Sequence, residues 1–144
     1  MHEQFQVVFD ATDPQRLAAF WAVALHYEFQ LPPLEFDSWD EFADKMGIPE
    51  EDRDKLVALV PKGKTGNRIL FQKVPEPKSA KNRVHIDVPS GADRNAPKLD
   101  RVAAIEAKVA ELVEAGGTAG ESHSEFGAVW TVMQDPEGNE FCVV

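Results

Sequence analysis

Apolar and polar residues alternate with a period of two over several short runs of the chain, and this period predicts β-strands. The runs that we assign to strands or extended segments are 5–10, 27–31, 56–60, 67–74, 83–88, 118–122, 127–134 and 139–144. Two other stretches repeat apolar residues at intervals of three and four, which is typical of amphipathic helices. Asp13 and Pro14 favour a helix start, and this helix ends near His26. A second helix opens at Asp100 and ends before Gly116.

The order of these elements repeats once along the chain. A βαβ unit, an inserted segment and two strands are followed by a second βαβ unit and two strands, which gives a repeat of about 65 to 80 residues. We place the first module at 1–78, with an acidic insert at 35–54, and the second module at 79–144. Neither module alone buries enough apolar surface to be stable. We therefore expect a single α+β domain in which two curved mixed sheets pair into a cup, with the helices outside.

The first strand of each module has one apolar and one more polar face. The residues expected to pack on the helix are Phe5, Val7 and Phe9 in the first module and Val84, Ile86 and Val88 in the second. The residues on the opposite face are Gln6, Val8 and Asp10 in the first module and His85, Asp87 and Pro89 in the second. Polar side chains on the inward faces of both modules predict a ligand cleft rather than a second core.

Three segments, together with the repeat, carry a family resemblance. They are Asp13–Trp21 (DPQRLAAFW), Asn82–Asp87 (NRVHID) and Asp135–Phe141 (DPEGNEF). Over nearly its whole length the chain resembles the glyoxalase, bleomycin-resistance and dioxygenase proteins of the vicinal oxygen chelate superfamily, and most closely their glyoxalase-like branch. This resemblance implies the same fold of paired βαβββ modules that surround an open cup.

The resemblance also implies where a metal would bind. In the family's enzymes, the first and last strands of each module usually supply one ligand each to a divalent ion. The matching positions are Gln6, Gln72, His85 and Cys142, and only His85 is the usual residue at its position. Two neutral amides, one imidazole and one thiol compensate the charge of a divalent cation poorly. We therefore expect no metal and no other cofactor, with these four side chains meeting in the cup as ligand-binding groups.

His85 and Asp87 offer a catalytic alternative. They lie two residues apart on one predicted strand, so both side chains point to the same face. A carboxylate near an imidazole fixes its tautomer and raises its basicity, as a general base in an isomerase or lyase requires. Equally open is a structural role, in which His85 forms hydrogen bonds in the cleft and Asp87 pairs with Arg83 or a neighbouring strand. Cys142 by itself is typical of a small buried hydrophobic residue.

Charge narrows the classes of partner. The 144 residues include 15 basic and 25 acidic side chains, and this net charge of −10 disfavours nucleic acid and anionic membranes. The insert 35–54 holds nine acidic and two basic residues, so it carries −7 of this charge. It is either a solvated excursion or a lid that attracts a cationic ligand. Trp39, Phe42 and Met46 form an apolar stripe within it, which must cover the core, a ligand or a second copy of the chain in a homodimer.

The cysteine content and the absence of long apolar runs bear on disulfides, on metal clusters and on where in the cell the protein is located. A single cysteine excludes an internal disulfide and a Cys-based zinc cluster. No apolar run reaches the roughly 18 residues that a membrane-spanning helix needs. The first four residues are polar and do not resemble a signal peptide. We therefore expect a cytoplasmic location.

Two functions stay open from the sequence. The first is a metal-independent protein that binds, and sequesters, a small drug or metabolite in the cup, with Trp39, Phe71 and Trp130 as apolar walls. The second is a lyase or isomerase that uses His85 and Asp87 as acid and base, or an atypical metal site.

Overall fold

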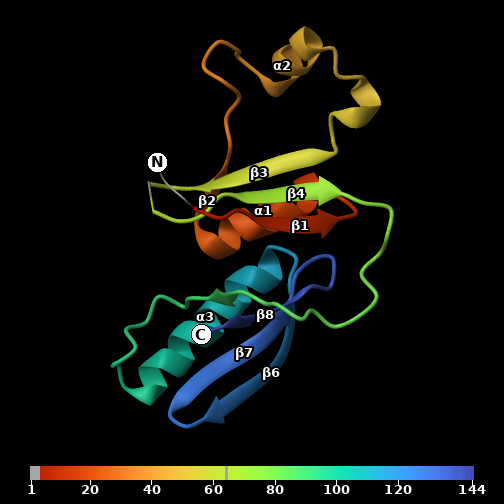
Figure 1. Cartoon of the computed structure of the whole chain (residues 1–144). Coiled ribbons are helices and arrows are strands. Elements are labelled where there is room, and N and C mark those ends of the chain that lie inside the picture. Colours follow the sequence, from red (N-terminus) through yellow and green to blue (C-terminus); the bar gives the residue numbers. More distant parts are fainter. Residues whose placement is uncertain (1–3, 64) are drawn as a thin grey trace. The chain divides into compact units, whose positions relative to one another are not determined.

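The computed structural model describes residues 4–63 and 65–144. Residues 1–3 and 64 lie outside the described part. The structure therefore does not test the expectation that the first residues are not a signal peptide. The chain forms two compact units (Figure 1). The first comprises residues up to Ala22 together with His26–Pro77, and the second comprises Val23–Leu25 and Lys78–Val144.

The first unit is a four-stranded mixed sheet with its helices. Its elements are β1 (Val7–Ala11), α1 (Pro14–Leu25), β2 (Tyr27–Phe29), α2 (Trp39–Met46), a 3₁₀ turn (Glu50–Asp52), β3 (Leu56–Pro61) and β4 (Ile69–Lys73). The strand order in the sheet is β1-β4-β3-β2. Strand β1 runs parallel to β4, whereas the other neighbours are antiparallel.

The second unit repeats this arrangement without the insert. Its elements are β5 (Asp87–Val88), α3 (Lys98–Glu114), β6 (Thr118–Glu125), β7 (Ala128–Gln134) and β8 (Glu140–Val143). The strand order is β5-β8-β7-β6, and β5 runs parallel to β8. Because strand order and strand direction match those of the first unit, the structure confirms an α+β fold built from two βαβββ modules.

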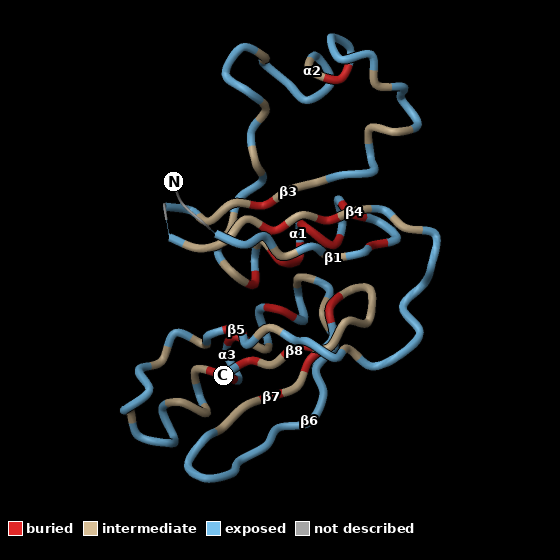
Figure 2. Tube along the Cα trace, in the orientation of Figure 1, coloured by how far each residue is buried: buried red, intermediate tan, exposed pale blue. Residues whose placement is uncertain are grey.

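Helix α1 begins where its capping residues predict. The Asp13 carboxylate accepts a hydrogen bond from the Arg16 amide at 3.1 Å, and Pro14 occupies the first helical turn. The helix buries Leu17, Phe20 and Trp21 completely or nearly so. Figure 2 shows buried segments along α1. Burying a side chain of this size contributes about 1.5–3 kcal/mol. The apolar stripe of α1 therefore forms the core of the first unit.

The sheet of the first unit packs against that stripe through one of its two faces. The Phe9 ring lies 5.1 Å from the Trp21 ring and 5.1 Å from the Phe71 ring. Leu59 is fully buried on the same face. Because side chains alternate along a strand, Leu70 and the neighbours of Leu59 in β3 point away from this core. That second face of the sheet is free to form a site.

The first strand of the second module is shorter than the alternation predicts. Only Asp87 and Val88 form β5, although the sequence predicts a strand over 83–88. The register with β8 covers these two residues, and Val84, three residues before β5, is 84% exposed. Phe5 likewise precedes β1 and is 72% exposed. The expected packing of both apolar trios on the helices was therefore wrong at these two positions.

Other boundaries shift by a few residues. Helix α3 begins at Lys98, after Pro97, rather than at Asp100. Strand β6 continues to Glu125 because it pairs along most of its length with β7. In the described part of the chain, every helix is too short or too polar to cross a membrane.

Candidate functional site

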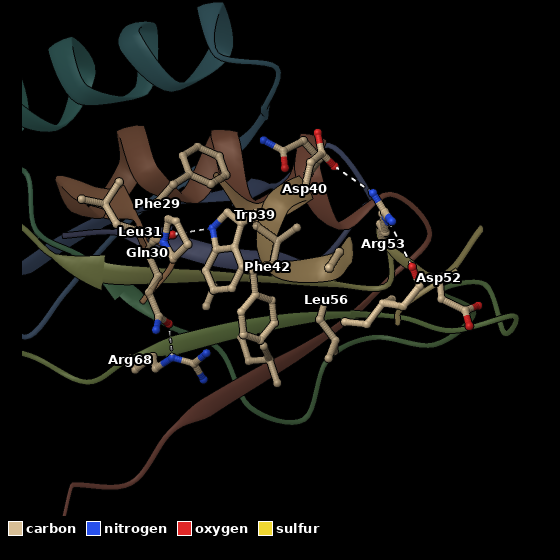
Figure 3. Close-up of a pocket in the computed structure, with 17 residues that line it drawn as sticks. Phe29, Gln30, Leu31, Trp39, Asp40, Phe42, Asp52, Arg53, Leu56 and Arg68 are labelled. Atoms are coloured by element: carbon tan, nitrogen blue, oxygen red, sulfur yellow. Dashed lines mark hydrogen bonds and ion pairs between the residues drawn. The ribbon is translucent and has the colours of Figure 1, made fainter. Parts of the chain in front are cut away.

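A cavity of about 570 Å³ lies in the first unit, on the sheet face that points away from the α1 core (Figure 3). Strands β3 and β4 form one wall, and the insert that carries α2 forms the opposite wall. The principal apolar side chains around it are Phe29, Leu31, Trp39, Phe42, Leu56 and Leu70. The principal polar side chains are Gln30, Asp40, Asp52, Arg53 and Arg68. The cavity is thus mainly apolar, with a few polar groups at its rim.

Local hydrogen bonds fix α2 beside this cavity. The Ser38 hydroxyl accepts a hydrogen bond from the Glu41 amide at 3.0 Å, and the Glu41 carboxylate accepts one from the Asp37 amide at 2.7 Å. Gly47 ends the helix in the left-handed conformation, with φ of 69°. The sequence signal for this helix is therefore a capped apolar stripe inside an acidic segment.

Two of the three residues in that stripe face the cavity. The Trp39 indole Nε1 donates to the Gln30 carbonyl oxygen at 2.9 Å, which ties α2 to the segment after β2. The Trp39 and Phe42 rings meet edge to face, with centroids 5.5 Å apart. Met46 is 60% exposed and does not line the cavity. The stripe therefore covers a pocket at Trp39 and Phe42 rather than the main core.

The cavity has charged residues on the side of the insert. The Arg53 guanidinium donates to the Asp44 carboxylate at 2.5 Å and lies 3.6 Å from the Asp40 carboxylate. The hydrogen bond to Asp44 raises the pKa of Arg53 above its ordinary value. Asp52 pairs with Lys55 at 2.5 Å, and this hydrogen bond raises the pKa of Lys55. The insert's charges at the cavity are therefore largely paired with one another.

Arg68 is the cationic side chain on the opposite wall. Its Nε donates to the Gln30 Oε1 at 2.6 Å, and its Nη1 donates to the Gln6 Oε1. No carboxylate forms an ion pair with Arg68 among residues 4–63 and 65–144. Sequence reasoning missed this residue, although it shares a strand face with Gln72 and Leu70, and that alternation was the available signal.

The structure does not bring Gln6 and Gln72 to a common point. Gln6 accepts from Arg68, whereas the Gln72 amide donates to the Asp10 carboxylate at 2.8 Å. Asp10 and Gln72 are cross-strand neighbours in the parallel pairing of β1 with β4. Each amide is therefore bonded to a neighbour in its own sheet.

Two of the aromatic residues predicted as ligand walls lie elsewhere. Phe71 is fully buried in the α1 core, so its ring does not reach the cavity. Trp130 stacks on His123 in the second unit, with ring centroids 5.4 Å apart. These two rings line a smaller cavity of about 210 Å³ beside α3. Of the three predicted walls, the structure places Trp39 at the larger cavity.

His85, Asp87 and Cys142 gather in the second unit. The His85 Nε2 lies 3.3 Å from the Asp87 Oδ1, and both side chains are about half exposed. Asp87 and Cys142 are cross-strand neighbours in β5 and β8. One donor atom from each of the three residues lies within 4.8 Å of the other two. Sequence reasoning expected His85 and Asp87 to share a face, and it did not place Cys142 beside Asp87.

The Cys142 thiol is held in its neutral form. Burial, and then the negative charge of Asp87, raise the pKa of Cys142 above its ordinary value. A thiol of raised pKa is a weak nucleophile at neutral pH. A soft or borderline cation would displace the thiol proton and convert Cys142 to the thiolate, because metal binding favours the deprotonated form.

The three donors of this cluster are of the types that fit a zinc-like ion. Imidazole nitrogen, carboxylate oxygen and thiolate sulfur are all common ligands of Zn²⁺. The positions implied by the family resemblance supply two strong donors, His85 and Cys142. The structure adds the Asp87 carboxylate as a third. The cluster is therefore a better cation site than the sequence indicates, although it lies in a different unit from Gln6 and Gln72.

Glu140 has a structural role next to this cluster. Its carboxylate accepts a hydrogen bond from the Asn82 amide at 2.9 Å and lies 3.2 Å from the Lys78 ammonium. The bond from Asn82 is the main reason that the pKa of Glu140 is lowered. Glu140 therefore fixes the segment that leads into β5 and is not free to act as a ligand.

The comparisons with known proteins agree with this architecture. A family model described as a glyoxalase-like domain matches residues 6–144. No curated protein matches the chain significantly in sequence.

Solved structures of low sequence identity share the fold. An enzyme of the glyoxalase/bleomycin resistance protein/dioxygenase family from Burkholderia phytofirmans PsJN is 15% identical, with a TM-score of 0.59 over 96% of this chain and 94% of that chain. A fosfomycin resistance protein from Listeria monocytogenes, in complex with Mn(II), is 9% identical, with a TM-score of 0.60 over 99% and 90%. A lactoylglutathione lyase from Agrobacterium tumefaciens is 16% identical, with a TM-score of 0.53 over 96% and 90%.

At these identities the solved structures establish the fold alone, whereas the family model covers almost the whole sequence. The resemblance seen in the three sequence segments is thereby confirmed. The chain therefore belongs to the family of glyoxalase-like domains, within the vicinal oxygen chelate superfamily.

Proposed function

We propose that this chain binds a small organic molecule in the cavity between α2 and the β3–β4 face, and that this binding needs no metal. The observation that carries the proposal is the cavity itself: about 570 Å³, walled by aromatic and aliphatic side chains with polar groups at the rim. Small-molecule sites in proteins commonly have this size and this composition. The predicted cup between the two modules stays a prediction.

The residues around the cavity support a role in binding rather than in bond-making. The insert's charged side chains form ion pairs, and Arg68 is held by two amides. Because these charged groups are already engaged by neighbouring side chains, the arrangement favours holding a ligand over transferring a proton. Solved structures of this fold include drug resistance proteins, so sequestration of a drug or metabolite is the role that we propose.

A titration monitored by NMR tests the binding proposal. The indole N–H signal of Trp39, assigned through the Trp39→Phe variant, reports on the cavity wall because it donates to Gln30. We expect members of a panel of aromatic drugs and carbonyl metabolites to shift this signal saturably while the indole signal of Trp130 stays fixed. A panel that shifts neither signal contradicts the proposal. Steady release of a product from a bound compound would replace binding by catalysis.

A second function is favoured by a separate observation, the cluster of His85, Asp87 and Cys142. In this alternative the second unit supports a lyase or isomerase reaction, with Asp87 orienting the His85 imidazole as general base. A divalent ion held by the three donors would supply Lewis-acid polarisation of a carbonyl oxygen. One solved structure of this fold is a lactoylglutathione lyase, which makes this class of reaction a reasonable alternative.

Metal analysis distinguishes the two functions. Titration with Co²⁺ gives a thiolate-to-metal absorption band if Cys142 becomes a ligand, and this readout does not depend on activity. The alternative requires a stoichiometric site that is lost in both His85→Ala and Cys142→Ser variants. The same titration of Gln72→Ala serves as the control, because Gln72 lies in the other unit and should leave the band unchanged. Absence of a band would remove the metal form of the alternative.

A further inference from the structure

The two arginines at the cavity have different electrostatic surroundings. Arg53, on the insert, lies near Asp40 (Figure 3). It is also bonded to Asp44, so its charge is compensated twice. Arg68, on the sheet side, is bonded to the side-chain oxygens of Gln30 and Gln6. An amide oxygen accepts a hydrogen bond but carries no net charge. Within the described residues, Arg68 therefore brings an uncompensated positive charge to the cavity.

The geometry around Arg68 leaves part of its guanidinium available. The amide bonds engage Nε and Nη1, and the structure forms no bond from Nη2 to another described residue. A guanidinium has five N–H donors in a planar fork, which matches the two oxygens of a carboxylate or a similar acid. Because Arg68 is half-buried, solvent screens its charge less than it screens a fully exposed one.

The other wall of the cavity is suited to an apolar body. Trp39 and Phe42 present two rings at right angles to each other, and Leu56 and Leu70 close the sheet side. The acidic groups near these rings do not compete for Arg68, because Asp40 lies beside Arg53 and Asp52 pairs with Lys55. Within the part of the chain that the structure describes, the cavity therefore combines an unpaired cationic group at Arg68, apolar and aromatic walls, and charged groups on the insert that are paired with one another.

We propose that the ligand class of this cavity is an organic anion: a carboxylic or comparable acid on an aromatic or branched apolar body, with the acid group bound by Arg68. This inference rests on the proposed function and specifies its ligand. It differs from one of the two alternatives for the acidic insert, a lid that attracts a cationic ligand, because the insert's carboxylates at the cavity are already paired.

Three probes that share one ring system test the inference. They are 1-naphthaleneacetate, the neutral 1-naphthaleneacetamide and the cationic 1-naphthylmethylamine, each titrated into the full chain by calorimetry and by the Trp39 indole signal. A single charge-assisted bidentate contact favours the acid over the amide by about tenfold in Kd. We expect this order of affinity in the unaltered chain.

Matched variants assign the preference to one arginine. Arg68→Gln should bring the affinities for the acid and the amide to within about twofold of each other, because the charge-dependent contact is lost. Arg68→Lys should restore part of the preference, because it keeps the charge without the planar fork. Arg53→Gln is the control and should keep the full preference, because Arg53 is already occupied by carboxylates. Circular dichroism and the melting temperature verify that each variant is folded.

Each remaining outcome decides a separate point. Equal affinity of the unaltered chain for acid and amide overturns the anion inference and leaves the binding function standing. Tightest binding of the amine would show that the acidic insert governs ligand choice, which also overturns the inference. Binding of none of the three probes, with no shift at Trp39 across the wider panel, contradicts the proposed function itself.

Discussion

The two modules share one strand order, yet they use the same face of their sheets for different chemistry. Asp10 and Gln72 in the first module occupy the cross-strand pair that Asp87 and Cys142 occupy in the second. Gln72 donates a good hydrogen bond to Asp10 and satisfies it. In the second module Asp87 lies 3.3 Å from His85, whereas the residue two positions before Asp10 in the first module is the apolar Val8. Duplication of the backbone therefore left each module free to acquire its own side-chain chemistry.

The insert adds a second difference between the modules. In the first module the segment 35–54 supplies a second wall over the sheet and encloses a cavity of about 570 Å³. The second module has no such segment between β6 and β7, which join through a short turn, and the His85–Asp87–Cys142 cluster stays partly open to solvent. Our proposal therefore places the ligand in the cavity of the first module, and the alternative function would use the cluster of the second module.

The largest expected effect concerns the two hydrophobic cores, which should contribute equally to the stability of the two modules. Phe71 and Phe141 sit at matching positions in β4 and β8, and both are fully buried or nearly so. We expect Phe71→Ala and Phe141→Ala each to lower the free energy of unfolding by about 3–5 kcal/mol, because each leaves a cavity in a packed core. Denaturant unfolding measures both. A cost below about 1 kcal/mol in either variant would show that the modules do not rely equally on this position.

A smaller effect on the free energy of unfolding is expected at the Asp135 turn before β8, which is a feature of the second module. Asp135 is 2% exposed, and it accepts bonds from the Glu137 amide, the Asn139 amide and the Asn139 side chain. Asp135→Ala leaves buried donors without this partner and should cost about 1–3 kcal/mol in thermal or denaturant unfolding. Lys62→Ala, in the exposed turn of the first module, is the control and should change stability by less than about 0.5 kcal/mol.

The assignment of binding to the first module predicts a difference between two tryptophans. Trp39→Ala removes an aromatic wall of the larger cavity and should weaken binding of any cavity ligand by about tenfold, roughly 1.4 kcal/mol. Trp130→Ala alters the other unit and should leave the Kd unchanged. Calorimetry with 1-naphthaleneacetate measures both. A larger loss of affinity in the Trp130 variant would move the site to the second module.

The smallest expected effect concerns the Cys142 thiol. Burial and the charge of Asp87 raise the pKa of Cys142, so the reactive thiolate is scarce until the pH exceeds the ordinary value for cysteine. Asp87→Asn removes the repulsion, lowers that pKa and should increase the rate of alkylation by iodoacetamide at pH 8. Asp10→Asn, at the equivalent position of the first module, is the control and should leave the rate unchanged. An unchanged rate in the Asp87 variant would show that burial alone sets the pKa.

The sign of the related stability effect follows from the same shift. A raised pKa means that the folded chain holds the Cys142 proton to higher pH than the unfolded chain does. The unfolded state therefore loses this proton first, and this contribution to stability is complete below the ordinary pKa and declines as the pH rises above it. Cys142→Ser should remove that decline from a plot of unfolding free energy against pH.

The architecture could be predicted from the amino-acid sequence, because the local signals and the repeat agree. The cap at Asp13, the stripe through Leu17 and Trp21, and the turn at Asp135 each place an element within a few residues of its position in the structure. The same signals occur twice, and the two sheets share one strand order. Periodicity reports burial on one face of an element, and burial is what organises the core.

The positions of the two sites depend on contacts between residues that are distant in the sequence. Whether Phe71 points to the core or to a cavity depends on which face of β4 meets α1, and one residue of register exchanges the two faces. Arg68 acquires its importance from Gln30 and Gln6, which lie 38 and 62 residues away in the sequence. Asp87 and Cys142 meet because β5 pairs with β8 across the length of the second module. Strand register and packing set the contacts between distant residues. The hydrophobic pattern along the chain does not predict these contacts.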